Sequence, residues 1–277
     1  MNDAAELEAF LAASVSRLDA YLDHVLPRAS ERPESLHEGM RYAVFSGGKR
    51  LRPALVFAAA HACGLEASRA LPVAAAVELV HTYSLVHDDL PAMDDDALRR
   101  GRPTVHIKYG EANAILVGDA LLAEAFAALA RGDLPNVVLA RLAGAAGSRA
   151  LVGGQVDDLA FTAELATPEL VRSIHERKTA ALFRFSAWAP GAVAGCPTAE
   201  LEQLDRFGLA YGRAFQMVDD LLDGDLEECS ILHVCDEPTA RARVASEVAD
   251  ALVAADAFGH AGVYLRGLAG AVSGRST

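Results

Sequence analysis

Apolar residues recur every three or four positions along nearly the whole chain. The first such segment, AAELEAFLAASVSRLDAYLDHVL at residues 4–26, places its leucines, phenylalanine and valines at this spacing, with charged residues between them. This period is typical of an amphipathic α-helix that packs one face against a core. The strict alternation that indicates a β-strand is scarce. The pattern therefore predicts an all-α protein.

Two consecutive stretches are too apolar for surface helices. RPALVFAAAHACGL at residues 52–65 and ALPVAAAVELVHTYSLVH at residues 70–87 consist largely of alanine, leucine and valine. A helix that is apolar around its whole circumference must be buried, so we place both at the centre. Further helical patterns cover residues 111–130, 135–161, 167–195, 198–223 and 238–259. In the fourth of these, Thr198 is the candidate N-cap, with Glu200 and Glu202 in the first turn.

Glycine and proline mark loops within SGGKRLRP, RGRPTVH and RGDLPN, but no low-complexity linker divides the chain and no repeat is present. The 277 residues are 52% hydrophobic, which is ample for a large core. We therefore predict that residues 1–277 form a single domain, one bundle of many helices.

The net charge of −13 argues against a nucleic-acid ligand. The first residues lack the basic head and apolar core of a signal peptide, and no charge-free apolar run reaches about 18 residues, so we expect no membrane span. The four cysteines are scattered, as in a reduced, cytoplasmic protein. Cys229, His233 and Cys235 match no zinc-binding spacing and lack a fourth ligand.

One short stretch, LVHDDLPAMDDDALRRGRP at residues 85–103, holds five aspartates followed by three arginines. Its simplest interpretation is a solvated loop. However, the aspartates follow an apolar helix that Pro91 must end, and the resulting turn lets Asp94 come back beside Asp88. Paired carboxylates at the end of a buried helix are typical ligands for magnesium.

A second acidic cluster lies in FQMVDDLLD, about 130 residues further on. Asp219 and Asp223 are four residues apart, so on a helix their Cβ atoms lie on one face about 5–6 Å apart. Gln216 lies one turn earlier on that face. A polar stripe facing water is the alternative, but the surrounding residues are apolar. Two such clusters on apolar helices together predict a magnesium site.

Basic residues accompany the acidic ones. GGKRLRP carries Lys49, Arg50 and Arg52 in a glycine-rich turn before a helix, which is a good phosphate site. Arg99 and Arg100 directly follow the first acidic cluster. Each of these residues alone would usually be a solvated surface charge. Lysine is scarce, however, and two of the three lysines fall within motifs. Lys49 lies in GGKRLRP, and Lys178 lies beside Thr179 in HERKTAAL. The third lysine is Lys108.

Five motifs in this order resemble those of the trans-isoprenyl diphosphate synthases, and most of all the bacterial farnesyl diphosphate synthases. They are GGKRLRP, HTYSLVHDDLPAMDDDALRRGRPTVH, GGQVDDL, HERKTAALF and FQMVDDLLD, between residues 38 and 223. The first acidic motif has the longer spacing, with four residues between its second and third aspartates, that is typical of the bacterial enzymes. The resemblance implies a helical bundle around a central cavity, a homodimer, and about three magnesium ions, for which manganese can substitute.

The resemblance also implies roles for individual residues. Asp88 and Asp94 would hold magnesium on the allylic diphosphate, with Asp219 and Asp223 opposite them. The residues that bind the allylic diphosphate would be Arg99 and Lys178, and those that bind isopentenyl diphosphate would be Lys49, Arg52, His81 and Arg100.

Two further pairs of residues would act on the allylic tail. Thr179 and Gln216 would flank the tail and the developing carbocation. Tyr83 and Ser84 lie five and four residues before Asp88, about 6–7.5 Å deeper along a straight helix. An aromatic residue at the position of Tyr83 closes the product tunnel in the family. This predicts farnesyl diphosphate, with geranyl diphosphate second; a packed aromatic without a role in chain length is the simpler interpretation.

The chain departs from the family after the second acidic motif, where a loop with glycine and a diphosphate-binding lysine is expected. DDLLDGDLEECSILHVCDEPTARARV contains no lysine, Glu227 and Glu228 bring negative charge, and Arg241, Arg243 and Arg266 are the nearby cations. A catalytically impaired homologue or partner subunit, and a class I terpene cyclase, therefore remain alternatives. Two intact acidic motifs argue against the first, and the second diphosphate site at GGKRLRP argues against the cyclase.

Overall fold

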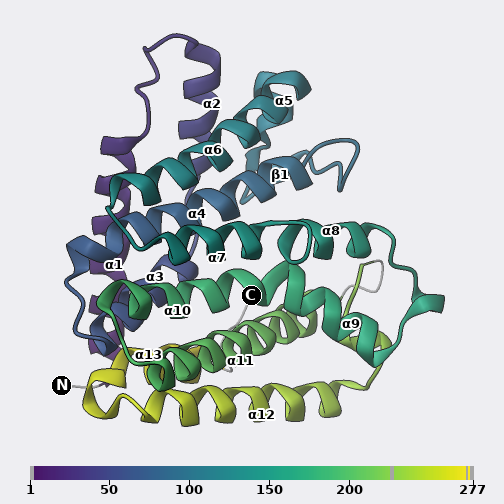
Figure 1. Cartoon of the computed structure of the whole chain (residues 1–277). Helices are drawn as coiled ribbons and strands as arrows, with labels where there is room; N and C mark the ends of the chain where they lie inside the picture. The colour runs from purple at the N-terminus through teal and green to yellow at the C-terminus, as the bar shows by residue number, and fades with distance from the viewer. Residues whose placement is uncertain (1–2, 225–227, 273, 275–277) are drawn as a thin grey trace. The chain divides into compact units, whose positions relative to one another are not determined.

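The structure is a computed structural model that describes residues 3–224, 228–272 and 274 (Figure 1). Its contacts divide the chain into two compact units, described one at a time below. Unit 1 comprises residues 1–11, 55–70 and 135–277, as far as they are described, and unit 2 comprises residues 12–54 and 71–134. The described part is helical almost throughout, which confirms the all-α prediction. The single domain stays a prediction.

Unit 2 contains the predicted central helix and its neighbours. Its helices are α2 (Glu34–Val44), α5 (Val105–Tyr109), α6 (Glu111–Arg131) and the larger parts of α1 (Asp3–Val25) and α4 (Ala67–Asp88). Helix α2 packs against both α5 and α6. The side chains of α4 from Val73 to Val77 are fully buried, as the all-apolar pattern predicted.

The only strands in the described residues are two strands of two residues each, which form a hairpin in unit 2. Strand β1 (Leu98–Arg99) pairs antiparallel with β2 (Arg102–Pro103). The two turn residues, Arg100 and Gly101, have φ angles of 54° and 73°. Positive φ at both turn positions matches the twist of the flanking strands. The hairpin therefore projects three arginines of the first acidic motif from one compact turn.

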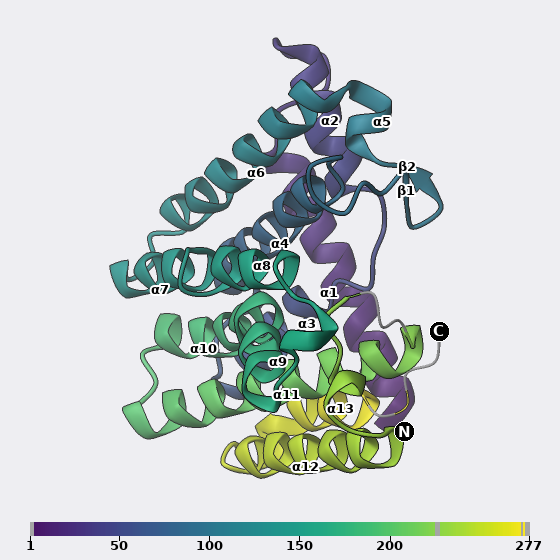
Figure 2. The ribbon, with the colours of Figure 1, turned by 90° about the vertical axis from the view of Figure 1, so that its right-hand side faces the viewer.

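Unit 1 is built around the longest helix, α11 (Thr198–Asp223), which packs against α10 (Ala181–Ala194) and α12 (Glu237–Asp256). Figure 2 shows α11 and α12 side by side. Most of α3 (Leu51–Ala62) also belongs to this unit. The remaining helices are α7 (Asn136–Ala146), α8 (Leu151–Leu159), α9 (Pro168–Ile174) and α13 (Val263–Val272).

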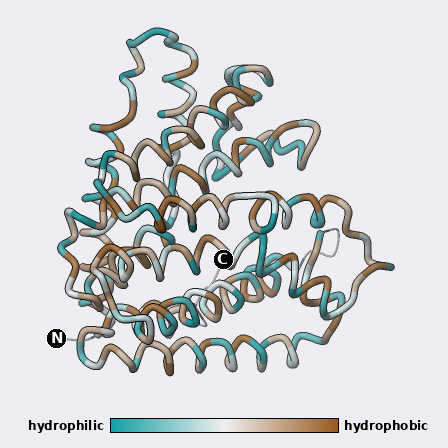
Figure 3. Tube along the Cα trace, in the orientation of Figure 1, coloured by the Kyte–Doolittle hydropathy of each residue, from teal (hydrophilic) through white to brown (hydrophobic). Residues whose placement is uncertain are grey.

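Two predicted helices are interrupted in the structure. Residues 135–161 break into α7 and α8 at Gly147, whose extended backbone ends the first helix. Residues 167–195 contain a π-helix, η2 (His175–Ala180), between α9 and α10. The 3₁₀ turns η1 (Ala163–Leu165), η3 (Ile231–His233) and η4 (Gly259–Gly262) complete the described elements. Apolar periodicity does not reveal such breaks, because hydrophobic residues recur along the chain on both sides of each break (Figure 3).

The predicted N-cap at Thr198 is wrong. The N-cap of α11 is Pro197, with φ −59° and ψ 154°, and no side chain caps this helix end. Pro197 fixes the entry of the chain, so Thr198 is already helical. Side-chain caps instead occur at Thr167, which accepts from Leu170 N, and at Asp236, which accepts from Thr239 N.

Two stretches are long and apolar enough to cross a membrane by length and composition alone, Glu111–Arg131 and Asn136–Leu159. The first is α6, whose Ala114, Val117 and Leu121 are fully buried within the protein. This spacing is that of a core helix. The second stretch comprises α7 and α8, which are interrupted between them. Neither pattern is strong support for a membrane span.

Candidate active site

The first acidic motif begins where α4 ends, at Asp88. The chain then turns at Pro91, and the backbone N–H of Asp94 donates to the backbone carbonyl of Asp88 at 2.9 Å. The N–H of Asp95, which has φ 54°, donates to the carbonyl of Leu90 at 3.2 Å. The structure thus brings the two predicted metal ligands of this motif side by side in the backbone, as the turn at Pro91 predicted.

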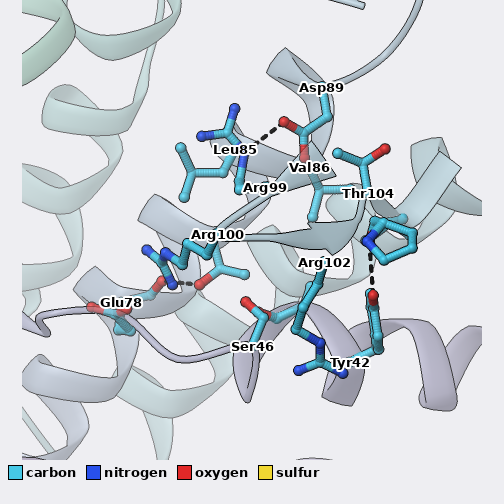
Figure 4. A pocket seen from close by; sticks show the side chains of 14 residues that line it. Tyr42, Ser46, Glu78, Leu85, Val86, Asp89, Arg99, Arg100, Arg102 and Thr104 are labelled. Atoms are coloured by element: carbon cyan, nitrogen blue, oxygen red, sulfur yellow. Dashed lines mark hydrogen bonds and ion pairs between the residues drawn. The ribbon is translucent and has the colours of Figure 1, made fainter. Parts of the chain in front are cut away.

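Asp89 has a different task from its neighbour Asp88. Its side chain is buried, and it accepts a hydrogen bond from Arg99 Nε at 2.5 Å (Figure 4). Asp96 accepts from Nη2 of the same arginine at 3.2 Å. Burial raises the pKa of Asp89, and Arg99 opposes that shift. Arg99, a predicted ligand of the allylic diphosphate, is therefore held by carboxylates of the motif that precedes it.

The hairpin also reaches the glycine-rich turn of GGKRLRP. Arg100 Nη1 donates to the backbone carbonyl of Gly47. A Cβ atom at Gly48 would lie 2.5 Å from the same nitrogen, and Gly48 has φ 127°. Only glycine combines that conformation with so close an approach. The predicted isopentenyl diphosphate ligand Arg100 therefore lies against the turn that carries Lys49.

Arg50 is not available to a ligand, although the sequence counted it among three cations. It is buried, and its guanidinium donates to Glu78 Oε1 at 2.6 Å, to Asp19 Oδ1 at 3.1 Å and to the carbonyl of Val44 at 2.6 Å. Such a buried pair needs its full set of hydrogen bonds to offset desolvation. Arg50 therefore anchors the turn and leaves Lys49 and Arg52 as the cations of the motif.

His81 lies among the arginines of unit 2. Burial and the nearby Arg52, followed by Arg100, Arg99 and Arg50, hold the pKa of His81 well below its usual range. The arginines lower the pKa because a protonated imidazole would add to their positive field. Arg50 is committed to Glu78, so the guanidinium groups of Arg52, Arg99 and Arg100 are the ones near His81 that can attract an anion. The predicted ligands Arg52, His81, Arg99 and Arg100 are thus brought together.

The predicted chain-length residues, Tyr83 and Ser84, lie on α4 about one turn before Asp88. The Tyr83 side chain is 6% exposed and meets the ring of His87 edge-on, with centroids 5.8 Å apart. His87 Nε2 is 3.1 Å from the carbonyl of Ile115. A Cβ atom at Gly118 would lie 2.1 Å from the same His87 nitrogen. Tyr83 is therefore backed by His87, which contacts α6 at Ile115 and Gly118. Ser84 donates to the carbonyl of His81 at 2.9 Å instead.

The second acidic motif lies in unit 1, on the last turns of α11. This helix is continuous to Asp223 and ends at Gly224, which has φ 60°. Asp219 and Asp223 therefore lie one turn apart on the same face, as predicted from their spacing. Asp219 is half-buried and Asp223 exposed.

The middle aspartate of this motif, Asp220, faces the interior of unit 1. Its Oδ2 accepts from the backbone N–H of Ile231 at 2.7 Å and lies 3.4 Å from His175 Nε2. Its Oδ1 accepts from Gln216 Nε2 at 2.9 Å. Burial raises the pKa of Asp220, and His175 and the two donors oppose that shift. Sequence reasoning assigned Asp220 and His175 no role, because nothing in the periodicity distinguishes them from their neighbours.

The structure also joins the two residues predicted to flank the carbocation. Thr179 Oγ1 donates to Gln216 Oε1 at 2.6 Å. Thr179 belongs to the π-helix η2, and Gln216 to α11. Single π-helical turns frequently occur at functional sites, because they turn side chains away from the regular helical face. Residues 37 positions apart therefore share one hydrogen-bonded chain that ends at Asp220.

GGQVDDL holds the HERKTAALF segment in place. Lys178 pairs with Asp158, and Arg177 pairs with Asp157. A Cβ atom at Gly154 would lie 2.4 Å from the backbone nitrogen of Lys178. The glycine therefore lets α8 approach η2 closely, and the two aspartates then fix the basic side chains. The sequence analysis assigned no roles to the aspartates of GGQVDDL. The two acidic residues of this motif and the two basic residues of HERKTAALF could have suggested that they form ion pairs.

The described part of the segment after α11 is held by contacts within unit 1. Besides the bond from Ile231 to Asp220, the ring of His233 lies tilted by 55° to that of Phe161, with the centroids 5.1 Å apart. Glu227 lies outside the described residues. Of the cations considered as substitutes for the missing lysine, Arg241 pairs with Glu237 and Arg266 with Asp256. Both are committed to acidic partners on the surface.

The donor set fits magnesium. In the described part of the chain, no three or more His, Cys, Asp or Glu side chains cluster closely enough to hold a metal ion. Magnesium needs no such cluster, because it keeps several waters and takes one or two carboxylates together with substrate phosphates. The pairs Asp88 and Asp94, and Asp219 and Asp223, each provide that number of carboxylates. The ion would therefore be held jointly with a phosphate-bearing substrate.

Comparisons with known proteins agree with this class of site. The sequence model of the family described as Polyprenyl synthetase matches residues 33–230. Farnesyl diphosphate synthase of Bacillus subtilis (strain 168) is 42% identical over 225 residues, 79% of this chain and 76% of the relative. A chloroplastic geranylfarnesyl diphosphate synthase of Leucosceptrum canum is 40% identical over 227 residues, 79% of this chain and 62% of the relative.

Solved structures show the same similarity. A geranyltransferase from Legionella pneumophila has a TM-score of 0.92 at 32% identity, covering 99% of both chains. An FPP/GFPP synthase from Zymomonas mobilis has a TM-score of 0.89 at 35% identity, covering 96% of this chain and 98% of the other. The fold and site thus define a prenyltransferase of the all-α isoprenoid class. The chain belongs to the polyprenyl synthetase family and is an enzyme of the prenyl diphosphate synthase type.

Proposed function

We propose that the protein condenses isopentenyl diphosphate with an allylic diphosphate, dimethylallyl or geranyl diphosphate, in a magnesium-dependent reaction. The observation that supports this most is the arrangement within unit 2. Arginines lie near His81, and the same helix ends about two turns further along at Asp88, to which Asp94 hydrogen-bonds through the backbone. The arginines would bind one diphosphate without metal, and the neighbouring carboxylate pair would bind a second diphosphate through metal. This arrangement suits a reaction with two substrates.

The chain's own residues would divide the work as follows. Lys49, Arg52, His81 and Arg100 bind isopentenyl diphosphate, while Arg99 and Lys178, which Asp89 and Asp158 hold in place, bind the allylic diphosphate. Magnesium on Asp88, Asp94, Asp219 and Asp223, when bound, neutralises charge on the leaving diphosphate. Apolar helices exclude the water that would trap an allylic carbocation. The departing diphosphate accepts the proton released after carbon–carbon bond formation, so no protein base is required.

The test is incubation of the protein with both substrates and magnesium, followed by chromatography of the dephosphorylated products. We expect a prenyl alcohol longer than the allylic substrate by at least one isoprene unit, and no product after magnesium is removed with a chelator. Absence of any prenyl product across a full range of magnesium concentrations would contradict the proposal. It would favour a catalytically impaired homologue, whose supporting observation is that no lysine follows Lys178.

The acidic motifs provide a sharper test. We expect Asp88→Ala and Asp219→Ala each to lower kcat by about a thousandfold or more, because each removes a metal ligand at the leaving group. Stability should change little or rise slightly, because repulsion between neighbouring carboxylates is relieved. Asp119→Ala, an exposed aspartate on α6, is the matched control. Turnover in either motif variant close to that of Asp119→Ala would refute the metal-binding role of that residue.

We further propose that the main product is farnesyl diphosphate. The relatives are named for farnesyl, geranylgeranyl and geranylfarnesyl products, so family membership leaves the length open. Supporting the shorter product, Tyr83 is buried against His87, whose contact with Gly118 leaves little room to yield. Tyr83→Ala should release products longer than farnesyl diphosphate, whereas Tyr83→Phe should retain the parent spectrum. An unchanged spectrum in an active Tyr83→Ala variant would show that this residue does not set the length.

We also propose a homodimer. Supporting it, unit 2 exposes large apolar side chains at Ile107, Ile115 and Leu116, which are 55%, 46% and 56% exposed. Contiguous exposed apolar residues commonly mark a protein interface. Sedimentation at micromolar concentration should give the mass of two chains, and a monomer there would contradict the proposal.

A further inference from the structure

Asp220 uses both carboxylate oxygens inside unit 1, although it lies between two predicted metal ligands. Only 3% of its side chain is exposed. Oδ2 accepts from Ile231 N at 2.7 Å, and Oδ1 accepts from Gln216 Nε2 at 2.9 Å. The bond from Ile231 prevents the carboxylate from rotating, so Oδ1 is fixed toward Gln216.

This arrangement imposes a direction on the hydrogen bonds that follow. Both oxygens of Asp220 accept hydrogen bonds, whereas an amide has one donor end and one acceptor end. Gln216 must therefore turn its NH₂ group to Asp220 and its Oε1 to Thr179. The hydroxyl hydrogen of Thr179 then points to Gln216 Oε1, at an oxygen–oxygen distance of 2.6 Å. The remaining lone pairs of Thr179 Oγ1 point elsewhere.

We propose that Asp220 is a positioning residue, which acts through Gln216 so that Thr179 presents oxygen lone pairs, and not a hydrogen atom, to the allylic carbocation. This inference rests on the proposed function and on the position beside the developing positive charge that the family resemblance implies for Thr179. Dipoles that are fixed in advance toward a developing charge lower the barrier without reorganisation during the reaction. A reversed Thr179 hydroxyl would direct its positive end at the cation and raise the barrier.

Asp220→Asn reverses the direction of the chain while keeping its shape. Ile231 N still needs an acceptor, so the amide oxygen of the new side chain faces Ile231 and its NH₂ faces Gln216. Gln216 must then turn over and donate to Thr179, whose hydrogen is released toward the substrate. We expect kcat to fall about 10- to 100-fold, with KM for both diphosphates and the magnesium concentration for half-activation within about twofold of the parent values.

A double-mutant cycle with Thr179→Val separates this role from a structural one. Valine has the shape of threonine but no hydroxyl to direct. If Asp220 acts through that hydroxyl, adding Asp220→Asn to Thr179→Val should lower kcat by less than about twofold, so the two effects are not additive. Equal factors in both backgrounds, or a parental kcat for Asp220→Asn alone, would overturn the inference.

Two further readouts keep the test decisive. If Asp220→Asn fails to fold, Gln216→Met interrupts the same chain and leaves the bond from Ile231 to Asp220 intact. Its kcat should fall by a similar factor, and a parental kcat would overturn the inference. A parent chain that makes no prenyl product overturns the proposed function and this inference with it. An active parent with additive variants overturns the inference alone.

Discussion

At the scale of the residue, the aspartates and arginines of the motifs are divided into those that face a ligand and those that hold others in place. Asp89, Asp158 and Asp220 are each committed to a neighbouring side chain. Arg50 is likewise buried against Glu78. The aspartates and arginines predicted to face a ligand therefore have neighbouring aspartates and arginines that hold other side chains in place.

His81 gives a pH-dependent prediction. Because the pKa of His81 in the folded protein lies well below the unfolded value of about 6.5, the unfolded chain binds more protons as pH falls. Its contribution to stability is present above about pH 6.5 and is lost as pH falls below that value. The free energy of unfolding should decrease between about pH 7 and pH 5, and less steeply in His81→Gln. Parallel curves for parent and variant would show that His81 does not carry this dependence.

At the scale of the element, most helices could be predicted, because apolar periodicity records which face is buried. The turn of the chain at Pro91, after α4, followed from proline chemistry, and the shared face of Asp219 and Asp223 followed from their spacing. The π-helix η2 could not be predicted, since its extra residue per turn is fixed by contacts with α8 and α11. The role of Asp220 was hidden because its partner Ile231 lies in η3, which only the folded chain brings to α11.

The contact between α8 and η2 is testable through its glycine. Gly154→Ala would place a methyl group 2.4 Å from the backbone nitrogen of Lys178, so η2 must move. We expect the variant to lose about 1–3 kcal/mol of stability, and to lose activity because Lys178 and Thr179 are displaced. Gly144→Ala on α7 meets no atom within 4 Å and is the matched control, expected to be stabilising by up to about 1 kcal/mol. Similar unfolding free energies for the two variants would contradict the close approach.

At the scale of the whole molecule, an acidic protein with a net charge of −13 must bind two anionic substrates. Under the proposed function, the arginines around His81 in unit 2 and Lys178 in unit 1 supply the positive charge for this. No lysine follows Lys178 in the sequence, so the family's additional cation beside the leaving group is missing. The fold of each unit follows from its apolar pattern, but this local balance of charge does not, because it depends on which ion pairs form.

Grafting the family's glycine- and lysine-bearing loop between Gly224 and Glu228 tests that deficit. The added cation should tighten binding of the allylic diphosphate by about 1.5–3 kcal/mol, measured as a lower KM or as calorimetric affinity, and should raise the rate. A graft with glutamine in place of the lysine controls for loop length. If both grafts behave alike, another group already performs the task of the lysine.

Because Arg50 is buried against Glu78, the glycine-rich turn that it anchors should respond to added salt differently from Lys49 on the same turn. Both side chains are 4% exposed, so dissolved ions cannot come between them, and the turn they anchor keeps its form as ionic strength rises. Lys49, on the same turn, is exposed, and its attraction for a diphosphate is screened beyond about 8 Å at physiological ionic strength. Added salt should therefore weaken the attraction of Lys49 for the diphosphate that the proposed function assigns to it well before it loosens the turn.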